Sequence, residues 1–161
     1  MITIVRTNSS DSDFLDLVKS LDRELAIRDG EEHAFYSQFN TLAKIQHVVL
    51  AYEDPTPVGC GAMKQFEADS MEIKRMYVFP EYRGLGIATK VLAELERWAG
   101  ESGYVRCVLE TGKKQPEAIA LYTKNGYSSI PNYGQYVGKE NSVCFEKKIG
   151  RVHGHGQSGP R

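Results

Sequence analysis

The chain has 161 residues, of which 41% are hydrophobic, and this suits one globular domain better than two large ones. Its 20 lysine and arginine residues are balanced by 21 aspartate and glutamate residues, so no overall field attracts nucleic acid or an anionic membrane. No apolar stretch reaches the roughly 18 residues of a membrane-spanning helix, and the N-terminus lacks a signal-peptide pattern. We expect a cytoplasmic monomer or homodimer with no nucleic-acid or membrane partner.

The first half of the chain predicts two helices and an antiparallel meander. Asp13 is placed to cap a helix with an apolar stripe, and the turn residues 54–57 and 67–70 separate strand-like runs. The elements expected here are a strand at 2–6, a helix from Asp13 to Asp29, a polar helix at 31–45, and strands at 47–52, 58–66 and 71–78.

The second half predicts a return of the chain to the same sheet. An apolar face at helical spacing follows Gly86, and Gly100 to Gly103 ends that helix. The strand at 105–111 should run parallel to the strand at 71–78, because such crossovers are right-handed. A helix at 116–125 and a strand at 143–149 complete a single domain over 1–149. The glycine-rich tail at 150–161 is expected to be flexible.

The cysteines predict buried thiols. Cys60, Cys107 and Cys144 are odd in number, and each lies in an apolar strand-like run. This pattern fits a reducing compartment. In the tail, His153 and His155 have no third ligand nearby, so we expect no metal cofactor.

The segment from Glu72 to Thr89 is the most informative part of the sequence, because it reads as a strand, a glycine-bearing loop and a helix start. Gly84 and Gly86 lack a Cβ, so the loop can take positive φ and let a bulky anion approach its N–H groups. The following helix adds free N–H groups and the positive end of its dipole. The segment therefore predicts a phosphate-binding cradle.

Two common phosphate-binding loops are alternatives. A Walker loop is excluded, because Gly86 is followed by Ile87 and not by Lys. A dinucleotide fingerprint fits better, since only its third glycine is missing and Glu110 lies near the ribose-binding offset. It remains the runner-up, because five residues separate the strand from Gly84 and the chain shows only one strand-helix-strand unit of this kind.

The run Arg83-Gly-Leu-Gly-Ile-Ala88 resembles the Arg/Gln-x-x-Gly-x-Gly/Ala signature of the GNAT superfamily of N-acetyltransferases. A second segment, from Gln115 to Tyr127, resembles that superfamily's Asn-x-x-Ala-x-x-Leu-Tyr-x-x-x-Gly-Phe motif. Gln115 replaces the usual Asn, and Tyr127 replaces the usual Phe. The resemblance implies an α/β fold of the α+β type. Its mixed, mostly antiparallel sheet is splayed between the fourth and fifth strands, with helices on both faces.

The resemblance also implies acetyl-coenzyme A as co-substrate and direct acetyl transfer to a primary amine in a ternary complex. An alternative is a non-catalytic acyl-coenzyme A binding or sensor module. The residues expected at the cofactor are Met76, Tyr77, Val78, Arg83, Gly84, Leu85, Gly86, Ile87, Ala88, Thr89 and Gln115.

Two residues are candidates for the chemistry. Tyr122 occupies the Leu-Tyr position, where the resemblance implies a general acid that protonates the departing thiolate. Its other reading is core packing against Ala118 and Leu121. Glu72 lies where some members hold a general base, and its other reading is a solvated strand carboxylate. An alkyl ammonium has a pKa of roughly 10, so its proton needs a route at neutral pH.

The acceptor side is predicted from side-chain chemistry and from the resemblance, which implies that residues at these places line it. Aromatic rings attract an ammonium group, and a guanidinium pairs with a carboxylate. Both features favour a small amine or an amino-acid-like acceptor. The candidate substrate residues are Arg28, Tyr36, Tyr133 and Tyr136.

Overall fold

The structure is a computed structural model that describes residues 1–32, 35–36 and 45–150. The chain divides into two compact units, one of residues 1–64 and 73–95 and the other of residues 65–72 and 96–161. The single-domain assignment to residues 1–149 stays a prediction. Most of the helix predicted at 31–45, and the tail from residue 151 with its two histidines, lie outside the described residues.

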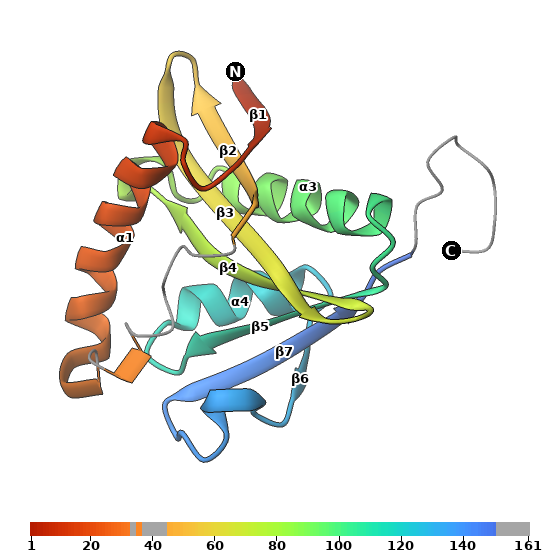
Figure 1. The fold of residues 1–161 in the computed structure, drawn as a ribbon. Coiled ribbons are helices and arrows are strands. Elements are labelled where there is room, and N and C mark those ends of the chain that lie inside the picture. Colours follow the sequence, from red (N-terminus) through yellow and green to blue (C-terminus); the bar gives the residue numbers. More distant parts are fainter. Residues whose placement is uncertain (33–34, 37–44, 151–161) are drawn as a thin grey trace. The chain divides into compact units, whose positions relative to one another are not determined.

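The first unit is built on an antiparallel meander (Figure 1). Its strands are adjacent in the order β1 (Ile2–Thr7), β2 (His47–Glu53), β3 (Thr56–Glu67) and β4 (Ser70–Val78). Ile2 pairs with Glu53 across β1 and β2, and the β2–β3 register shifts at a bulge between Ala51 and Tyr52. A turn of only two residues joins β3 to β4, and such a short turn makes these strands antiparallel. The predicted meander is confirmed, with slightly longer strands.

Two helices belong to this unit, α1 (Ser12–Asp29) and the first part of α3 (Ile87–Glu101). The expected cap of α1 was wrong by two residues. The side chain of Asp11 accepts hydrogen bonds from the N–H groups of Asp13 and Phe14, so Asp13 lies in the first turn. Gly30, with φ of 57°, ends the helix as predicted.

The two helices lie on opposite faces of the meander. Cys60 and Ala62 on β3 contribute to the core that α1 covers. Gly61 points the other way, and a Cβ built on it would lie 2.8 Å from Val91 and 2.9 Å from Leu95 of α3. Because side chains alternate between the faces of a strand, α3 therefore packs closely on the face opposite α1. The apolar stripe of α1 in the core consists of Phe14, Leu17, Val18, Leu21 and the partly buried Leu25.

The second unit contains β5 (Arg106–Gly112), α4 (Pro116–Lys124), β6 (Ser128–Ile130) and β7 (Ser142–Lys148). Strand β7 lies between β5 and β6 and is antiparallel to both. The predicted helix and strands are confirmed. Strand β6 was not predicted, because its three residues show no apolar alternation.

The start of β4 pairs with β5 in parallel, as predicted. Ser70 lies opposite Arg106, and the pairing among the described residues ends with Glu72 opposite Val108. The ladder between β5 and β7 continues to Gly112 opposite Ser142. The sheet is therefore mixed and mostly antiparallel, and β4 and β5 stop pairing after three residues. This topology makes the dinucleotide-binding alternative wrong, because that fold needs a mainly parallel, doubly wound sheet.

All three cysteines are buried free thiols, as expected. Burial raises the pKa of Cys60 and of Cys107 to about 12 and that of Cys144 to about 11. These thiols are protonated at neutral pH.

Among the described residues, no helix combines the length and the apolar character needed to cross a membrane.

Candidate active site

A loop with two left-handed glycines joins β4 to α3. After a short 3-10 turn at Pro80–Tyr82, Gly84 has φ of 81° and Gly86 has φ of 80°. A Cβ built on either glycine would meet nothing within 4 Å, so the space over the loop is open. Any other residue would be strained at this φ, which explains both glycines.

The first turn of α3 continues this loop. It begins with the N–H groups of Ile87 and Ala88, which lie at positions that an α-helix leaves without an intrahelical partner. The turn contains no acidic residue, and the Lys90 N–H donates to the Gly86 carbonyl at 3.2 Å. The loop and helix start therefore fit a phosphate group, which the helix dipole also favours.

The end of β4 leads into the loop. Tyr77 and Val78 are buried, and Met76 is partly buried. The Val78 carbonyl accepts a hydrogen bond from Arg83 Nε at 2.8 Å, so it is occupied by the chain itself. The next N–H, that of Phe79, donates to the Val58 carbonyl at 2.9 Å. These bonds fix where β4 stops and the loop begins.

Arg75 interrupts β4 just before this segment. Its φ of 60° is left-handed, although arginine has a Cβ. Such a backbone costs about 1–3 kcal/mol, and it persists only where the surrounding contacts offset that cost. Its buried guanidinium forms an ion pair with Asp22 of α1, and its carbonyl accepts a hydrogen bond from Cys60 Sγ at 3.4 Å. No residue pattern around Arg75 predicts this irregularity.

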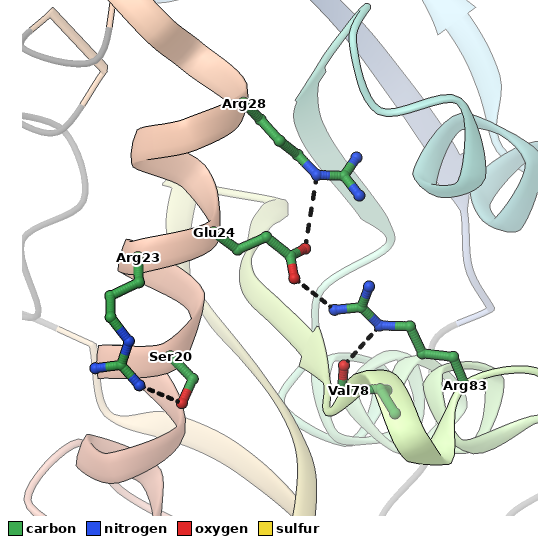
Figure 2. A network of polar contacts seen from close by, with 6 residues as sticks. All are labelled: Ser20, Arg23, Glu24, Arg28, Val78 and Arg83. Carbon is green, nitrogen blue, oxygen red and sulfur yellow. Dashed lines mark hydrogen bonds and ion pairs between the residues drawn. The ribbon is translucent and has the colours of Figure 1, made fainter.

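Arg83 and Arg28, both predicted site residues, meet at Glu24 of α1 (Figure 2). Glu24 Oε1 lies 2.9 Å from Arg83 Nη2, and Glu24 Oε2 lies 3.7 Å from Arg28 Nε. The Arg83 guanidinium also lies 5.5 Å from the centre of the Tyr77 ring. Sequence reasoning missed Glu24, for which the only signal was its four-residue spacing from Arg28. Arg28 lies in the last turn of α1, within the helix predicted from Asp13 to Asp29.

In the second unit, the structure brings Glu72 together with Tyr133. Glu72 is only 4% exposed, and its Oε2 accepts a hydrogen bond from the Tyr133 hydroxyl at 2.7 Å. The Tyr133 ring lies 4.7 Å from the Phe66 ring and 5.8 Å from the Tyr136 ring. Glu72 is thus a buried, hydrogen-bonded carboxylate, and the reading of Glu72 as a solvated surface residue is wrong.

Tyr122 is buried on α4. Its ring centre lies 5.8 Å from that of Tyr127 and 6.4 Å from that of Phe145. Burial, and then the negative charge of Glu110, raise the pKa of the Tyr122 phenol above its ordinary value. The hydroxyl therefore keeps its proton at neutral pH, as a general acid must. Sequence reasoning considered Glu110 only as a ribose ligand.

Gln115 and Tyr36 complete the predicted set. Gln115 directly precedes α4 and its N–H donates to the Gly112 carbonyl at 3.0 Å, but its side chain does not cap the helix. Tyr36 is buried, with its ring 5.1 Å from that of Phe35. Its sequence neighbours at 33–34 and 37–44 lie outside the described residues, so its role at the acceptor stays a prediction.

The fold and these residues define an acyltransferase of mixed α/β architecture, and comparison with known proteins supports this. The sequence profile of the Acetyltransferase (GNAT) family matches residues 14–127. An "IAA acetyltransferase" of Azospirillum brasilense is 33% identical over 150 residues, covering 92% of this chain and 98% of the relative.

Solved structures agree. A Klebsiella pneumoniae protein assigned as an acyl-CoA N-acyltransferase is 31% identical, with a TM-score of 0.77 over 92% of this chain and 98% of the other. A GNAT acetyltransferase of Elizabethkingia anophelis, solved with acetyl-CoA bound, shares the fold with a TM-score of 0.67 at 19% identity, covering 92% and 98% of the two chains. The chain therefore belongs to the GNAT family of acetyltransferases, and it is an enzyme.

Proposed function

We propose that the protein moves an acetyl group from acetyl-CoA directly to the primary amine of a small or amino-acid-like acceptor, in a ternary complex. The observation that carries the proposal is the loop between β4 and α3. Two left-handed glycines with open space above them precede a helix start without acidic residues. The acetyl-CoA in the Elizabethkingia anophelis structure supports the same donor for this chain.

When bound, acetyl-CoA supplies the acetyl group as a thioester. The backbone N–H groups of the cradle would hold the pyrophosphate, and the end of β4 would hold the pantetheine arm. The Val78 carbonyl accepts one hydrogen bond from Arg83, which leaves it one further lone pair for such a contact. The residues assigned to the donor are Met76, Tyr77, Val78, Arg83, Gly84, Leu85, Gly86, Ile87, Ala88, Thr89 and Gln115.

Glu72 is assigned as the general base. An acceptor amine with a pKa of roughly 10 arrives mainly as the ammonium ion at neutral pH, and it must lose a proton before it can attack a carbonyl carbon. Glu72 is the buried carboxylate of β4, fixed by its pairing opposite Val108. Its role is to accept that proton, directly or through water.

Tyr122 is assigned as the general acid. The thiolate that leaves the tetrahedral intermediate is stabilised when it receives a proton. A phenol whose pKa is raised by burial still carries its proton at neutral pH, so Tyr122 is in the correct state to donate. The phenolate is then reprotonated by solvent before the next turnover.

The acceptor is assigned by charge. Arg28 is a half-buried guanidinium at the end of α1, and it pairs with Glu24 at a long 3.7 Å. A guanidinium binds a carboxylate through two parallel hydrogen bonds, so Arg28 favours an amino-acid-like acceptor. Tyr36 and Tyr136 are the aromatic residues assigned to the ammonium side.

The proposal is tested by calorimetry with acetyl-CoA and by a thiol-release assay against amines, polyamines, amino acids and basic peptides. Gly86→Asp should abolish acetyl-CoA binding in a folded protein, because it places a carboxylate beside the pyrophosphate. Gly103→Asp is the matched control, since Gly103 also has a left-handed φ, of 95°, and open space around it. Equal acetyl-CoA affinity in the two variants would contradict the cradle assignment.

A further inference from the structure

The environment of Glu72 is unusual for a strand carboxylate. At 4% exposure, an ionised carboxyl group is costly unless hydrogen bonds replace its water. The bond from the Tyr133 hydroxyl, at 2.7 Å, has the length of a charge-assisted O–H···O⁻ bond. The backbone of Glu72 is fixed as well, because it forms the last parallel pair with Val108. The Tyr133 hydroxyl therefore holds one of the two carboxylate oxygens of Glu72.

Tyr133 itself is held on both sides. Its ring is tilted at 57° against Phe66, with centroids 4.7 Å apart, and it meets Tyr136 edge-on at 5.8 Å. Both contacts involve ring faces or edges and leave the hydroxyl for Glu72. The side chain thus acts as a rigid support for one carboxylate oxygen.

The loop that carries Tyr133 is fixed by its neighbour Asn132. The amide nitrogen of the Asn132 side chain lies 3.1 Å from each of three carbonyl oxygens, those of Tyr136, Lys139 and Ser142. These three carbonyls span the turn that leads into β7. The position of the Tyr133 hydroxyl is therefore set by the backbone as well as by ring packing.

The direction of the hydrogen bond is also fixed. Burial, and then the charge of Glu72, raise the pKa of the Tyr133 phenol above its ordinary value. Tyr133 stays protonated and keeps donating to Glu72 throughout the neutral range. It cannot take up the acceptor's proton, because a neutral phenol has only a weak acceptor oxygen.

We infer that Tyr133 is a positioning residue, whose hydroxyl holds the Glu72 carboxylate in the orientation in which it receives the acceptor's proton. This inference rests on the proposed role of Glu72 as base. In this role Tyr133 contacts Glu72 and acts on the acceptor only through it. The sequence had predicted a direct contact between Tyr133 and the acceptor.

The test is a double-mutant cycle with steady-state kinetics. Tyr133→Phe keeps the ring and removes the hydroxyl, and it should lower kcat roughly 10- to 100-fold, the effect expected of a misplaced catalytic group. The KM for acetyl-CoA should not change. In a Glu72→Ala background the same substitution should cost nothing further, because the group it positions is gone. Tyr104→Phe, on a partly buried tyrosine of the same unit, is the matched control for loss of a hydroxyl.

Asn132→Ala is a second variant, which keeps both the Tyr133 hydroxyl and the Glu72 carboxylate but removes the amide that fixes the loop. It should also lower kcat, and this loss should also vanish in the Glu72→Ala background. It keeps the test decisive if Tyr133→Phe fails to fold.

The outcomes separate the inference from the proposed function. If Glu72→Ala is slow but Tyr133→Phe and Asn132→Ala keep full turnover, the positioning role is wrong and the base survives. If Tyr133→Phe costs as much with Glu72→Ala as without it, Tyr133 acts independently and the inference is overturned. If Glu72→Ala turns over like the unmodified enzyme, the base assignment fails and the positioning role fails with it.

Discussion

The guanidinium of Arg83 in the glycine loop forms an ion pair with Glu24 of α1, and Nη2 lies 2.9 Å from Oε1. The two residues are 59 positions apart in the chain. Arg83 Nε bonds to the Val78 carbonyl at the same time. The side chain of this motif arginine therefore ties the loop to β4 and to α1, while its backbone remains part of the cradle. Glu24 is the residue that completes this tie.

Glu24→Gln should weaken acetyl-CoA binding moderately. Without the ion pair the loop is less ordered, and ordering it on binding costs conformational entropy. An ion pair that is about one-third exposed contributes about 0.2–1 kcal/mol, so Kd should rise about 1.4- to fivefold. Asp16→Asn removes the same charge from an exposed position of α1 and is the control for the overall field. Tighter binding by Glu24→Gln, measured by calorimetry, would mean that Glu24 competes with the phosphates for Arg83.

The ion pair between Asp22 and Arg75 should matter for stability. The Arg75 side chain is 1% exposed, so removing the Asp22 carboxylate leaves a buried cation without this ion pair. The left-handed backbone of Arg75 also loses this support. Asp22 is 54% exposed, which keeps the expected cost below that of a fully buried pair. Asp22→Ala should lower the free energy of unfolding by about 2 kcal/mol.

Thermal unfolding would measure this as a drop of several degrees in Tm, and Asp16→Ala is the matched variant on the same helix. An unchanged Tm for Asp22→Ala would show that another group or solvent compensates the Arg75 charge.

The elements with local signals were predictable from the sequence. Three such features depend on residues close in the chain, and the structure contains all of them. They are the apolar stripe of α1, the left-handed glycines at 84 and 86, and the crossover to β5. Asp11 was missed as the cap because Asp11 and Asp13 both suit that role, and only the hydrogen bonds decide. Strand β6 forms by pairing with β7 and needs no apolar pattern of its own.

The polar partners of the site were not predictable, because they are far apart in the sequence. Tyr133 and Glu72 are 61 residues apart, and their pairing follows from the route of the chain. The left-handed Arg75 has no local signal either, since neither arginine nor its neighbours favour that conformation. Propensity describes what a segment prefers alone, whereas these contacts exist only in the packed fold.

The buried thiols predict a loss of stability at high pH. The pKa of Cys60 and of Cys107 is about 12 in the folded protein, above the ordinary value of 9.0. Folding therefore favours the neutral thiols. Their contribution is complete below pH 9 and is lost as the pH rises through the folded pKa. Denaturant unfolding at pH 8, 9.5 and 11 should show this decline, and it should be smaller in a Cys60→Ala, Cys107→Ala variant.

The same thiols should be unreactive in the folded enzyme. At pH 8 a disulfide reagent such as DTNB should titrate none of the three cysteines promptly in native protein and all three in denaturant, because only thiolates react. Rapid reaction of a native thiol would contradict its burial.

Tyr122→Phe removes one hydroxyl and keeps the ring contacts with Tyr127 and Phe145. If Tyr122 gives its proton to the thiolate, kcat should fall by roughly 10²- to 10⁴-fold, as is typical of a lost general acid, and acetyl-CoA affinity should change little. Tyr82→Phe, on a partly exposed tyrosine, controls for loss of a phenol.

The pH dependence of Tyr122→Phe adds a second criterion. Because burial raises the pKa of Tyr122, the phenol stays protonated through pH 9, and the acid should not limit turnover of the unmodified enzyme on the alkaline side of neutrality. The defect should therefore be of similar size from pH 7 to pH 9. An interaction made in the transition state lowers kcat and kcat/KM together, whereas a packing role appears in Tm. Turnover within about threefold of the unmodified enzyme, well short of a general-acid effect, would assign the proton to water or to Tyr77.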